Sequence, residues 1–188
     1  GIKRNWRKEL SVHMPDHVEY MDAVWVASPK KQEQIELMNV CQMSDKLQIL
    51  IMNIEALSTG RGVDFARSFL LPGSTLMVID ESTTIKNHAA RRTKNIMKIA
   101  NLAKYRRIMT GSPVTKSPLD LFSQVEFLGP WLLEQSNYYA FRARYAVIQQ
   151  RNVGSHSFQH VVSYQRLDEL TCILREFSTR ILKEDCLD

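Results

Sequence analysis

The chain has 188 residues, of which 44% are hydrophobic, and its 25 lysine and arginine residues outnumber its 20 aspartate and glutamate residues, giving a net charge of +5. This composition excludes a disordered or collagen-like chain and is typical of one globular domain. The longest apolar stretch, ILIMNIEAL, is interrupted by Asn53 and Glu55 and is far shorter than the roughly 18 residues of a membrane-spanning helix.

The start of the chain and its cysteines indicate the compartment. No apolar segment follows GIKRNW, so we expect no signal peptide. Cys41, Cys172 and Cys186 lie far apart and form no Cys-x-x-Cys pair, which favours reduced thiols over a disulfide or a zinc site. We therefore expect a cytoplasmic protein.

Helical and strand patterns alternate along the first 130 residues. Pro29 and Pro118 are each placed for the first turn of a helix, and Ser117 is placed to cap the second of these helices. Alternation of this kind predicts an α/β fold with a parallel sheet flanked by helices on both faces. The expected helices are 5–14, 29–42, 64–70, 88–103 and 117–128, and the expected strands are 23–28, 47–53, 75–80 and 105–109.

The pattern changes after Gly129 and Pro130. The sequence SNYYAFRARYAV is aromatic and basic, QQRNVGSHSFQH is polar and rich in turn residues, and LDELTCILREF returns to helical spacing. We interpret residues 131–176 as a mainly helical elaboration on the domain. Its aromatic cluster is expected to be core and not a platform for stacking bases; it comprises Tyr138, Tyr139, Phe141 and Tyr145.

Two apolar runs end on polar residues. TLMVIDE ends on Asp80 and Glu81, and YRRIM is followed by Thr110, Gly111 and Ser112. Runs of this composition are typical of buried parallel strands, and ligands of open α/β sheets bind beyond the carboxyl ends of such strands. Carboxylates at that place suit Mg²⁺ and a water-activating base. A helix cap or a solvated turn would explain the acidic pair alone equally well.

The stretch from Ser82 to Leu119 contains no acidic residue. Such a segment attracts a phosphate backbone without reading its sequence. From composition alone, a solvated basic helix is the favoured explanation. The basic residues are Lys86, Arg91, Arg92, Lys94, Lys98, Lys104, Arg106, Arg107 and Lys116.

The motifs together resemble a known family. DESTTIKN resembles the DEAH-x-x-KN signature, and RRIMTGSPVTKSPLDLFSQVEFLGP resembles the LTGTP segment, which are motifs II and III of Swi/Snf-type translocases of helicase superfamily two. GIKRNWRKEL and ILIMNIEAL resemble earlier segments of that family. LDELTCILREFSTRILKEDCLD resembles the helix and strand that close its first lobe, and the KEDCLD ending is most similar to phage and bacterial members.

The resemblance implies a RecA-like lobe of a DNA-dependent ATPase in a bacterial or phage-infected cell. It implies that Asp80 holds Mg²⁺ through water and that Glu81 polarises the water that attacks ATP. The residues implied in nucleotide sensing are Thr110, Gly111 and Ser112, and those implied beside double-stranded DNA are Lys86, Asn87, Arg91, Lys94 and Lys116.

Some features of the family are missing. None of the seven glycines is followed by Lys-Ser or Lys-Thr, as a phosphate-cradling loop requires. We therefore expect residues 1–188 to be one partial first lobe without its phosphate loop and without the second RecA-like lobe, and we expect negligible ATP hydrolysis by this chain alone. Ser82 and Thr83 replace the family's Ala-His, and Lys116 stands where many members carry Asn.

Two alternatives remain open at the level of sequence. One is a non-catalytic DNA-binding module that keeps the shape of a helicase lobe. The other is a metal-dependent nuclease that uses Asp80 and Glu81, although no acidic residue is followed two places later by lysine, as the common nuclease arrangement requires.

Overall fold

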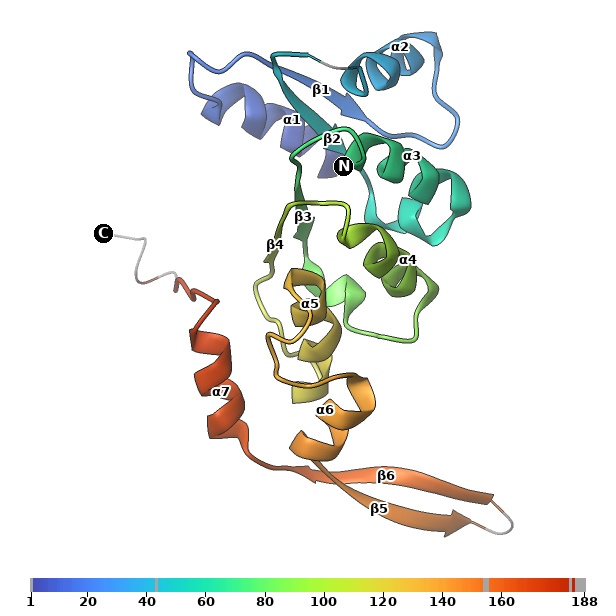
Figure 1. The fold of residues 1–188 in the computed structure, drawn as a ribbon, viewed down its shortest axis with the longest axis vertical. Coiled ribbons are helices and arrows are strands. Elements are labelled where there is room, and N and C mark those ends of the chain that lie inside the picture. The colour runs from blue at the N-terminus through green and yellow to red at the C-terminus, as the bar shows by residue number, and fades with distance from the viewer. Residues whose placement is uncertain (1, 43, 154–155, 183, 185–188) are drawn as a thin grey trace. The chain divides into compact units, whose positions relative to one another are not determined.

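The structure is a computed structural model, and it describes residues 2–42, 44–153, 156–182 and 184 (Figure 1). The chain divides into two compact units. The first unit comprises Gly1–Val78 and Ala89–Arg107, and the second comprises Ile79–His88 and Ile108–Asp188. Each unit is described by itself below. Within the described residues, no helix has the length and apolar character needed to cross a membrane.

The first unit alternates helices and strands in the predicted order, although its first strand covers residues 20–24 and not the expected 23–28. It contains α1 (Ile2–His13), β1 (Tyr20–Val24), α2 (Lys31–Val40), β2 (Leu47–Ile51), η1 (Ile54–Ser58), α3 (Gly60–Leu70) and α4 (Arg91–Ala100). Strands β1 and β2 pair in parallel, with Tyr20 opposite Leu47 and Val24 opposite Ile51. The parallel pairing confirms the predicted α/β class.

Apolar side chains hold the parallel pair against its helices. Ala23 of β1 is fully buried with Leu37 and Val40 of α2. Arg7 of α1 pairs with Asp22 of β1 and, at 2.8 Å, with Glu36 of α2. Residue 22 points to the opposite side of the strand from residue 23, because side chains alternate along a strand. The strand is therefore fixed to neighbouring helices through both of its faces.

Helix α3 approaches η1 so closely that only glycine fits. A Cβ atom on Gly62 would lie 2.1 Å from the Ala56 carbonyl oxygen. The hydroxyl of Thr59, the N-terminal cap of α3, accepts a 3.4 Å hydrogen bond from the Gly62 N–H. Helix α4 buries the predicted face, with Ile96, Ile99 and Ala100 at most 2% exposed. Ala103 is also buried, but it lies beyond the end of α4, so the helix is shorter than the expected range 88–103.

Strands β3 (Leu76–Asp80) and β4 (Tyr105–Met109) pair with each other. At their beginnings, the Tyr105 N–H donates to the Thr75 carbonyl at 3.0 Å. The prediction that β3 is a buried strand is wrong for one of its sides: Leu76 is 56% and Val78 45% exposed, whereas Ile79 is buried. Apolar composition alone gave that prediction, and composition does not show whether both sides of a strand are covered.

The second unit is built around a compact apolar cluster. It contains η2 (Ser82–Ile85), η3 (Pro118–Asp120), α5 (Leu121–Leu128), α6 (Tyr138–Tyr145), β5 (Ala146–Val153), β6 (His156–Tyr164) and α7 (Leu167–Arg175). The core residues are Leu119, Leu121, Phe122, Val125, Leu133, Phe141, Tyr145, Ala146 and Leu170.

The aromatic cluster is core in part. Phe141 and Tyr145 are fully buried, as predicted. Tyr138 is half-buried, and its ring stacks on that of His88 with a centroid distance of 3.6 Å. Tyr139 is 71% exposed, so the prediction is wrong for this residue. Adjacent residues of a helix face different directions, so Tyr139 lies at the edge of the cluster, where its ring meets the Tyr138 ring edge-on at a centroid distance of 5.8 Å.

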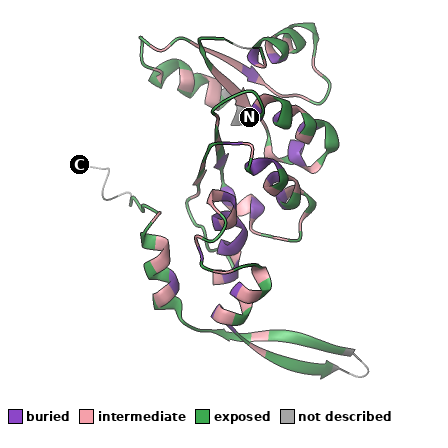
Figure 2. Cartoon of the chain, viewed as in Figure 1, coloured by how far each residue is buried: buried purple, intermediate pink, exposed green. Residues whose placement is uncertain are grey.

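The elaboration contains a long β-hairpin in addition to helices. Strands β5 and β6 are antiparallel over residues 146–164 and are exposed along most of their length (Figure 2). The polar stretch QQRNVGSHSFQH, interpreted as turn-rich, forms most of this hairpin. Because both faces of these strands are largely polar, the sequence lacks the apolar alternation of a half-buried strand. Residues 154 and 155 lie outside the described residues.

Near the end of the chain, the helix that the resemblance implies is present. Helix α7 lies where the sequence predicts one, and Leu170 anchors it in the core. Residues 178–182 do not form the strand that the resemblance implies. Lys183 and residues 185–188 lie outside the described residues.

Candidate functional site

The acidic pair ends β3 in the second unit. Asp80 is the last residue of the strand, and Glu81 adopts a left-handed backbone conformation with φ 53° and ψ 59°. This conformation costs an ordinary residue about 1–2 kcal/mol, so the surrounding structure must hold it. The chain turns sharply at Glu81 and enters η2.

Both carboxylates remain available to a ligand. Asp80 and Glu81 are exposed, and the Asp80 Oδ1 atom accepts a 3.0 Å hydrogen bond from the Glu81 N–H. Although Glu81 occupies the cap position of η2, its side chain makes no capping hydrogen bond. Among the described residues, no lysine or arginine forms an ion pair with either carboxylate. The helix-cap explanation of Glu81 is therefore not supported.

One buried side chain connects the segment after the acidic pair with the Thr-Gly-Ser-Pro turn. The Ser82 hydroxyl donates to the Gln124 Oε1 atom at 2.6 Å, and both residues are fully buried. The Gln124 Nε2 atom donates to the carbonyl oxygens of Pro113 at 2.7 Å and Asp120 at 2.8 Å. Gln124 thus touches the residue after Glu81 and the residue after Ser112.

The turn itself is ordered by its own hydroxyl groups. The Thr110 hydroxyl accepts a 3.3 Å hydrogen bond from the Ser112 N–H, and the Ser112 hydroxyl donates to the Val114 carbonyl at 3.0 Å. Gly111 is exposed, and a Cβ atom there would meet nothing within 4 Å. The turn therefore presents exposed polar groups at the end of β4.

A second polar network centres on Asp120. Its Oδ2 atom accepts hydrogen bonds from the Lys116 N–H at 2.9 Å, the Thr115 N–H at 3.1 Å and the Thr115 hydroxyl at 2.8 Å. The Lys86 ammonium donates to the Thr115 hydroxyl and lies 3.6 Å from the same carboxylate oxygen. The Ser123 hydroxyl of α5 donates to the Lys86 carbonyl at 3.4 Å.

Several opposing effects set the charge of Asp120. Burial by itself raises the pKa of the carboxyl, but the hydrogen bonds from Lys116 and Thr115 and the positive charge of Lys86 bring the pKa below its ordinary value. Asp120 is therefore ionised at neutral pH. Its negative charge offsets the positive charge of Lys86. A phosphate therefore has to compete with Asp120 for Lys86, which makes Lys86 less available than the basic run suggests.

The sequence profile of the SNF2-related domain matches residues 2–187. The chain belongs to the SNF2-related domain family.

Individual relatives match shorter parts of this SNF2-related domain. The chain is 28% identical over 125 residues to human TATA-binding protein-associated factor 172, covering 66% of the chain and 6% of that protein. It is 31% identical over 110 residues to Saccharomyces cerevisiae TATA-binding protein-associated factor MOT1, covering 58% of the chain and 6% of that protein. It is 30% identical over 112 residues to Bos taurus DNA annealing helicase and endonuclease ZRANB3, covering 60% of the chain and 10% of that protein.

A solved structure shares the fold. The Sulfolobus solfataricus SWI2/SNF2 ATPase core in complex with dsDNA superimposes with a TM-score of 0.64 at 24% identity, covering 98% of this chain and 32% of that one. The SNF2-related domain described here thus has the fold of part of that ATPase core, and it spans a small share of the length of its curated relatives.

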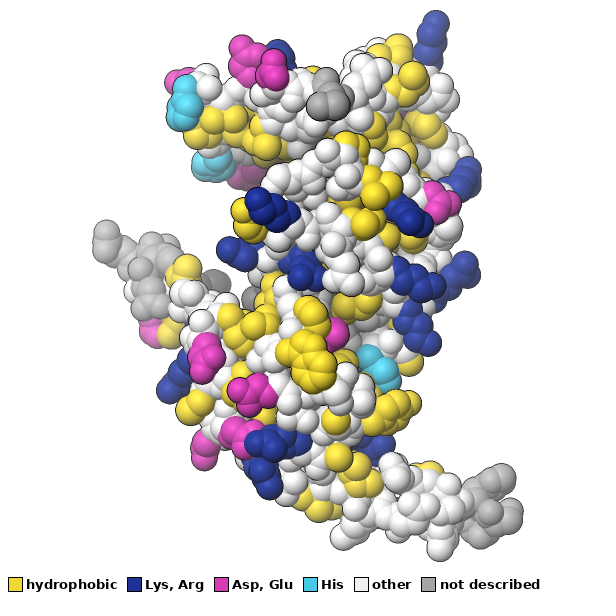
Figure 3. Space-filling model, in the orientation of Figure 1, with side chains coloured by type: hydrophobic (Ala, Val, Ile, Leu, Met, Phe, Trp, Pro, Cys, Tyr) yellow, Lys and Arg dark blue, Asp and Glu magenta, His cyan; other side chains and the backbone are white. Residues whose placement is uncertain are grey.

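The predicted site residues of the SNF2-related domain lie in both units. The second unit contains the acidic pair, the turn, Lys86, Asn87 and Lys116. Arg91 and Lys94 are exposed on α4 of the first unit, where basic side chains gather on the face shown in Figure 3. Not all of that basic run is solvated, because Arg92 pairs with Glu55 at 3.0 Å.

The residues that sequence reasoning missed are those that connect the motifs. Gln124 is a polar residue among apolar residues on the buried side of α5. A polar residue at such a position is the signal that could have identified it. Asp120 follows Lys116 by four residues in a turn, where a carboxylate commonly accepts N–H groups.

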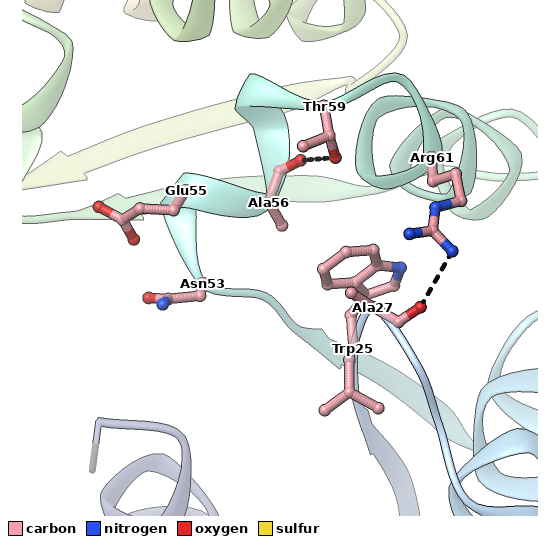
Figure 4. A pocket seen from close by; sticks show the side chains of 8 residues that line it. Trp25, Ala27, Asn53, Glu55, Ala56, Thr59 and Arg61 are labelled. Atoms are coloured by element: carbon pink, nitrogen blue, oxygen red, sulfur yellow. Dashed lines mark hydrogen bonds between the residues drawn. The ribbon is translucent and has the colours of Figure 1, made fainter.

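The first unit contains a hollow of its own beyond the ends of β1 and β2. It has a volume of about 370 Å³ and is lined mainly by Trp25, Asn53, Thr59 and Arg61 (Figure 4). The Arg61 guanidinium donates to the Ala27 carbonyl at 3.3 Å, and the Thr59 hydroxyl donates to the Ala56 carbonyl at 2.8 Å. The polar groups of this hollow are therefore largely used within the protein.

Proposed function

We propose that this SNF2-related domain carries the metal-binding and water-activating carboxylates of a DNA-dependent ATPase that moves along double-stranded DNA. The observation that carries this proposal is the link through Gln124, which joins the segment after Glu81 to the turn after β4. A buried amide that joins the segment after two exposed carboxylates to the segment after a polar turn supports a site in which the two motifs act together.

The donor set suits Mg²⁺. Magnesium in nucleotide sites is usually bound through one or two carboxylates, several waters and the phosphates of the substrate. Asp80 supplies an exposed carboxylate whose only described hydrogen bond comes from the neighbouring N–H. Asp80 would hold the ion, and the bound ion would neutralise charge that develops on the phosphates.

Glu81 is placed to orient water. Its exposed carboxylate lies one residue beyond the strand and makes no capping hydrogen bond to η2. As an ionised acceptor it polarises a water molecule for attack on the terminal phosphate of ATP. Thr110, Gly111 and Ser112 would sense the nucleotide from the other turn, and Gln124 would transmit the change.

The basic residues provide the DNA contact. Lys86 and Asn87 follow η2 directly, Lys116 follows the second turn, and Arg91 and Lys94 are exposed on α4. Lysine and arginine at these positions bind phosphates of duplex DNA without reading its sequence. The structural neighbour is itself a complex with double-stranded DNA, which supports this part of the proposal.

The phosphate loop and the second lobe belong to the same proposal. Because none of the seven glycines precedes Lys-Ser or Lys-Thr, ATP turnover requires a phosphate-cradling loop and an arginine from outside these 188 residues. The KEDCLD ending favours a phage or bacterial member of the family. We expect the 188-residue chain alone to hydrolyse ATP negligibly.

The test compares two glutamates with the same backbone geometry. In the longest natural polypeptide that contains this chain, Glu81→Gln should lower the rate of DNA-stimulated ATP hydrolysis about 100-fold or more, because a positioned base contributes about 10²–10⁴-fold. The matched control is Glu134→Gln, since Glu134 is also exposed and left-handed, with φ 54°. It should leave the rate unchanged.

Other outcomes would reject the proposal. DNA binding without any DNA-stimulated hydrolysis in the unchanged polypeptide would identify a non-catalytic module. Cleavage of plasmid DNA that requires magnesium and is lost in Glu81→Gln would identify a nuclease.

A further inference from the structure

The β5–β6 hairpin has two chemically different faces. Residues that face each other across an antiparallel pair point to the same side, and successive residues alternate between the sides. One face, which we call the anchored face, carries the pairs Ile148–Val161, Gln150–Gln159 and Asn152–Ser157. The other, which we call the outer face, carries the pairs Gln149–His160 and Arg151–Phe158.

The anchored face is attached to the rest of the second unit. Ile148 and Val161 pack against its apolar core. The Arg142 guanidinium of α6 donates to the Gln159 Oε1 atom at 3.0 Å, and the Gln150 amide donates to the Ser157 hydroxyl. Five of the six side chains named on this face therefore have partners within the protein.

The base of the hairpin is rigidly held. Strand β5 begins at Ala146, directly after the fully buried Tyr145 that ends α6. The Tyr145 hydroxyl donates to the Glu169 carboxylate at 2.8 Å, and the Gln165 N–H donates to the Tyr145 carbonyl at 3.0 Å. The outer face is consequently presented by a fixed support and not by a loose loop.

The outer face presents groups suited to nucleotides. Gln149, Arg151, Phe158 and His160 are all exposed, and Phe158 is 47% exposed. Within the described part of the chain, Arg151 forms no ion pair. An exposed aromatic ring opposite an arginine combines a surface for base stacking with a partner for phosphate. The amide and imidazole next to them can hydrogen-bond to base edges.

Charge favours a polyanionic partner. No acidic residue occurs between Glu134 and Asp168, a stretch that contains the entire hairpin. Arg144 and Arg166 of this stretch pair with Glu169, whereas Arg151 lies on the outer face. A negatively charged strand therefore meets no repelling carboxylate along the hairpin.

We propose that the outer face of the β5–β6 hairpin binds unpaired nucleotides of DNA, with a base stacked on Phe158 and a phosphate paired with Arg151. Unpaired bases are favoured because bases inside a duplex stack on their neighbours and present only their edges, whereas an aromatic side chain needs a free face. This contact is separate from the duplex track of the proposed motor and does not require Asp80 or Glu81.

The test uses the 188-residue chain and fluorescence anisotropy with a labelled oligothymidylate of about 20 nucleotides, longer than the roughly 4–16 nucleotides that a stacking platform of this kind occupies. Phe158→Ala should weaken binding about 5- to 150-fold, the range expected from losing one stacked base. Arg151→Ala should reduce the slope of log affinity against log salt by about 0.7, the value for one phosphate of a single strand.

Matched variants separate stacking from folding. Asn152→Ala, on the anchored face, should leave the affinity unchanged. Phe158→Tyr keeps the ring and should retain binding. Circular dichroism should show the same spectrum for all four variants.

Three results would overturn the proposal. The first is unchanged oligothymidylate binding by Phe158→Ala. The second is a loss in Phe158→Ala that occurs with a labelled duplex of the same length and not with the single strand. The third is equal weakening by Asn152→Ala.

Discussion

Gln124 offers the sharpest test of how the two motifs are joined. In Gln124→Leu, the side chain keeps its approximate size but loses the hydrogen bonds to Ser82, Pro113 and Asp120. Ser82 is fully buried, so its hydroxyl loses its partner without gaining water, at about 1–3 kcal/mol. The carbonyls of Pro113 and Asp120 belong to residues that are not buried and regain water, at about 0.5–1.5 kcal/mol each. We expect the free energy of unfolding to fall by about 2–6 kcal/mol.

A double-mutant cycle isolates the pair. Ser82→Ala removes the other partner, and removal of both partners leaves no buried polar group unpaired. The double variant should therefore be less destabilised than the sum of the single variants, with a coupling of about 1–2 kcal/mol. Urea unfolding followed by circular dichroism measures the free energies, and hydrogen–deuterium exchange assigns the loss to peptides of η2 and α5.

The control for this cycle is Gln149→Leu, an exposed glutamine that should change stability by less than about 0.5 kcal/mol. Strictly additive effects of the Ser82 and Gln124 substitutions would refute the reasoning, because they would mean that the two side chains do not interact in the folded protein.

Two further predictions concern stability. Gly62→Ala should lower the melting temperature, because its Cβ atom would collide with the Ala56 carbonyl, whereas Gly60→Ala meets nothing within 4 Å and should not lower it; equal effects would contradict the close packing of α3 on η1. Asp120 has a lowered pKa, so its contribution to stability is present above the unfolded pKa of about 3.9 and is lost as the pH falls through the folded pKa. Urea midpoints measured between about pH 7 and pH 3 should therefore fall more steeply for the unchanged chain than for Asp120→Asn, and parallel profiles would rule this out.

The order of elements up to α5 was predictable because each carries a local signal. Apolar runs that end on polar residues located β3 and β4, and helical spacing of Ile96, Ile99 and Ala100 located the buried face of α4. Pro118 begins η3 and Ser117 precedes it, as expected, although the Ser117 side chain makes no capping hydrogen bond. These signals depend on neighbours in the chain, which the sequence contains directly.

The connections within the site depend on tertiary contacts and were not predictable in the same way. Ser82 and Gln124 are 42 residues apart, and the residues around each of them give no indication that the two side chains are in contact. The sequence shows that Ser82 and Thr83 replace the family's Ala-His, but it does not show what these residues contact. In the structure, the Ser82 hydroxyl is linked to the second turn through Gln124. The roles of Asp80, Glu81 and the turn residues stay predictions.

The β5–β6 hairpin was not predicted from the sequence, for a different reason. Its strands pack only Ala146, Ile148 and Val161 against the core, near the base, so the remaining polar side chains show neither helical nor strand periodicity. Cross-strand backbone hydrogen bonds form such a ribbon without an apolar face, and the sequence gives no direct sign of them.

The exposed side of β3 affects how readily this polypeptide associates with itself in solution. Leu76, Val78 and, on β4, Tyr105 expose hydrocarbon to water on strands whose edges attract other chains. When two chains associate through such a surface, each Å² of apolar surface that is buried contributes about 25 cal/mol of favourable free energy. Salts that strengthen apolar contacts increase this contribution. We therefore expect concentrated solutions in sulfate or phosphate to promote self-association of this chain, and dilute, low-salt buffers to keep it dispersed.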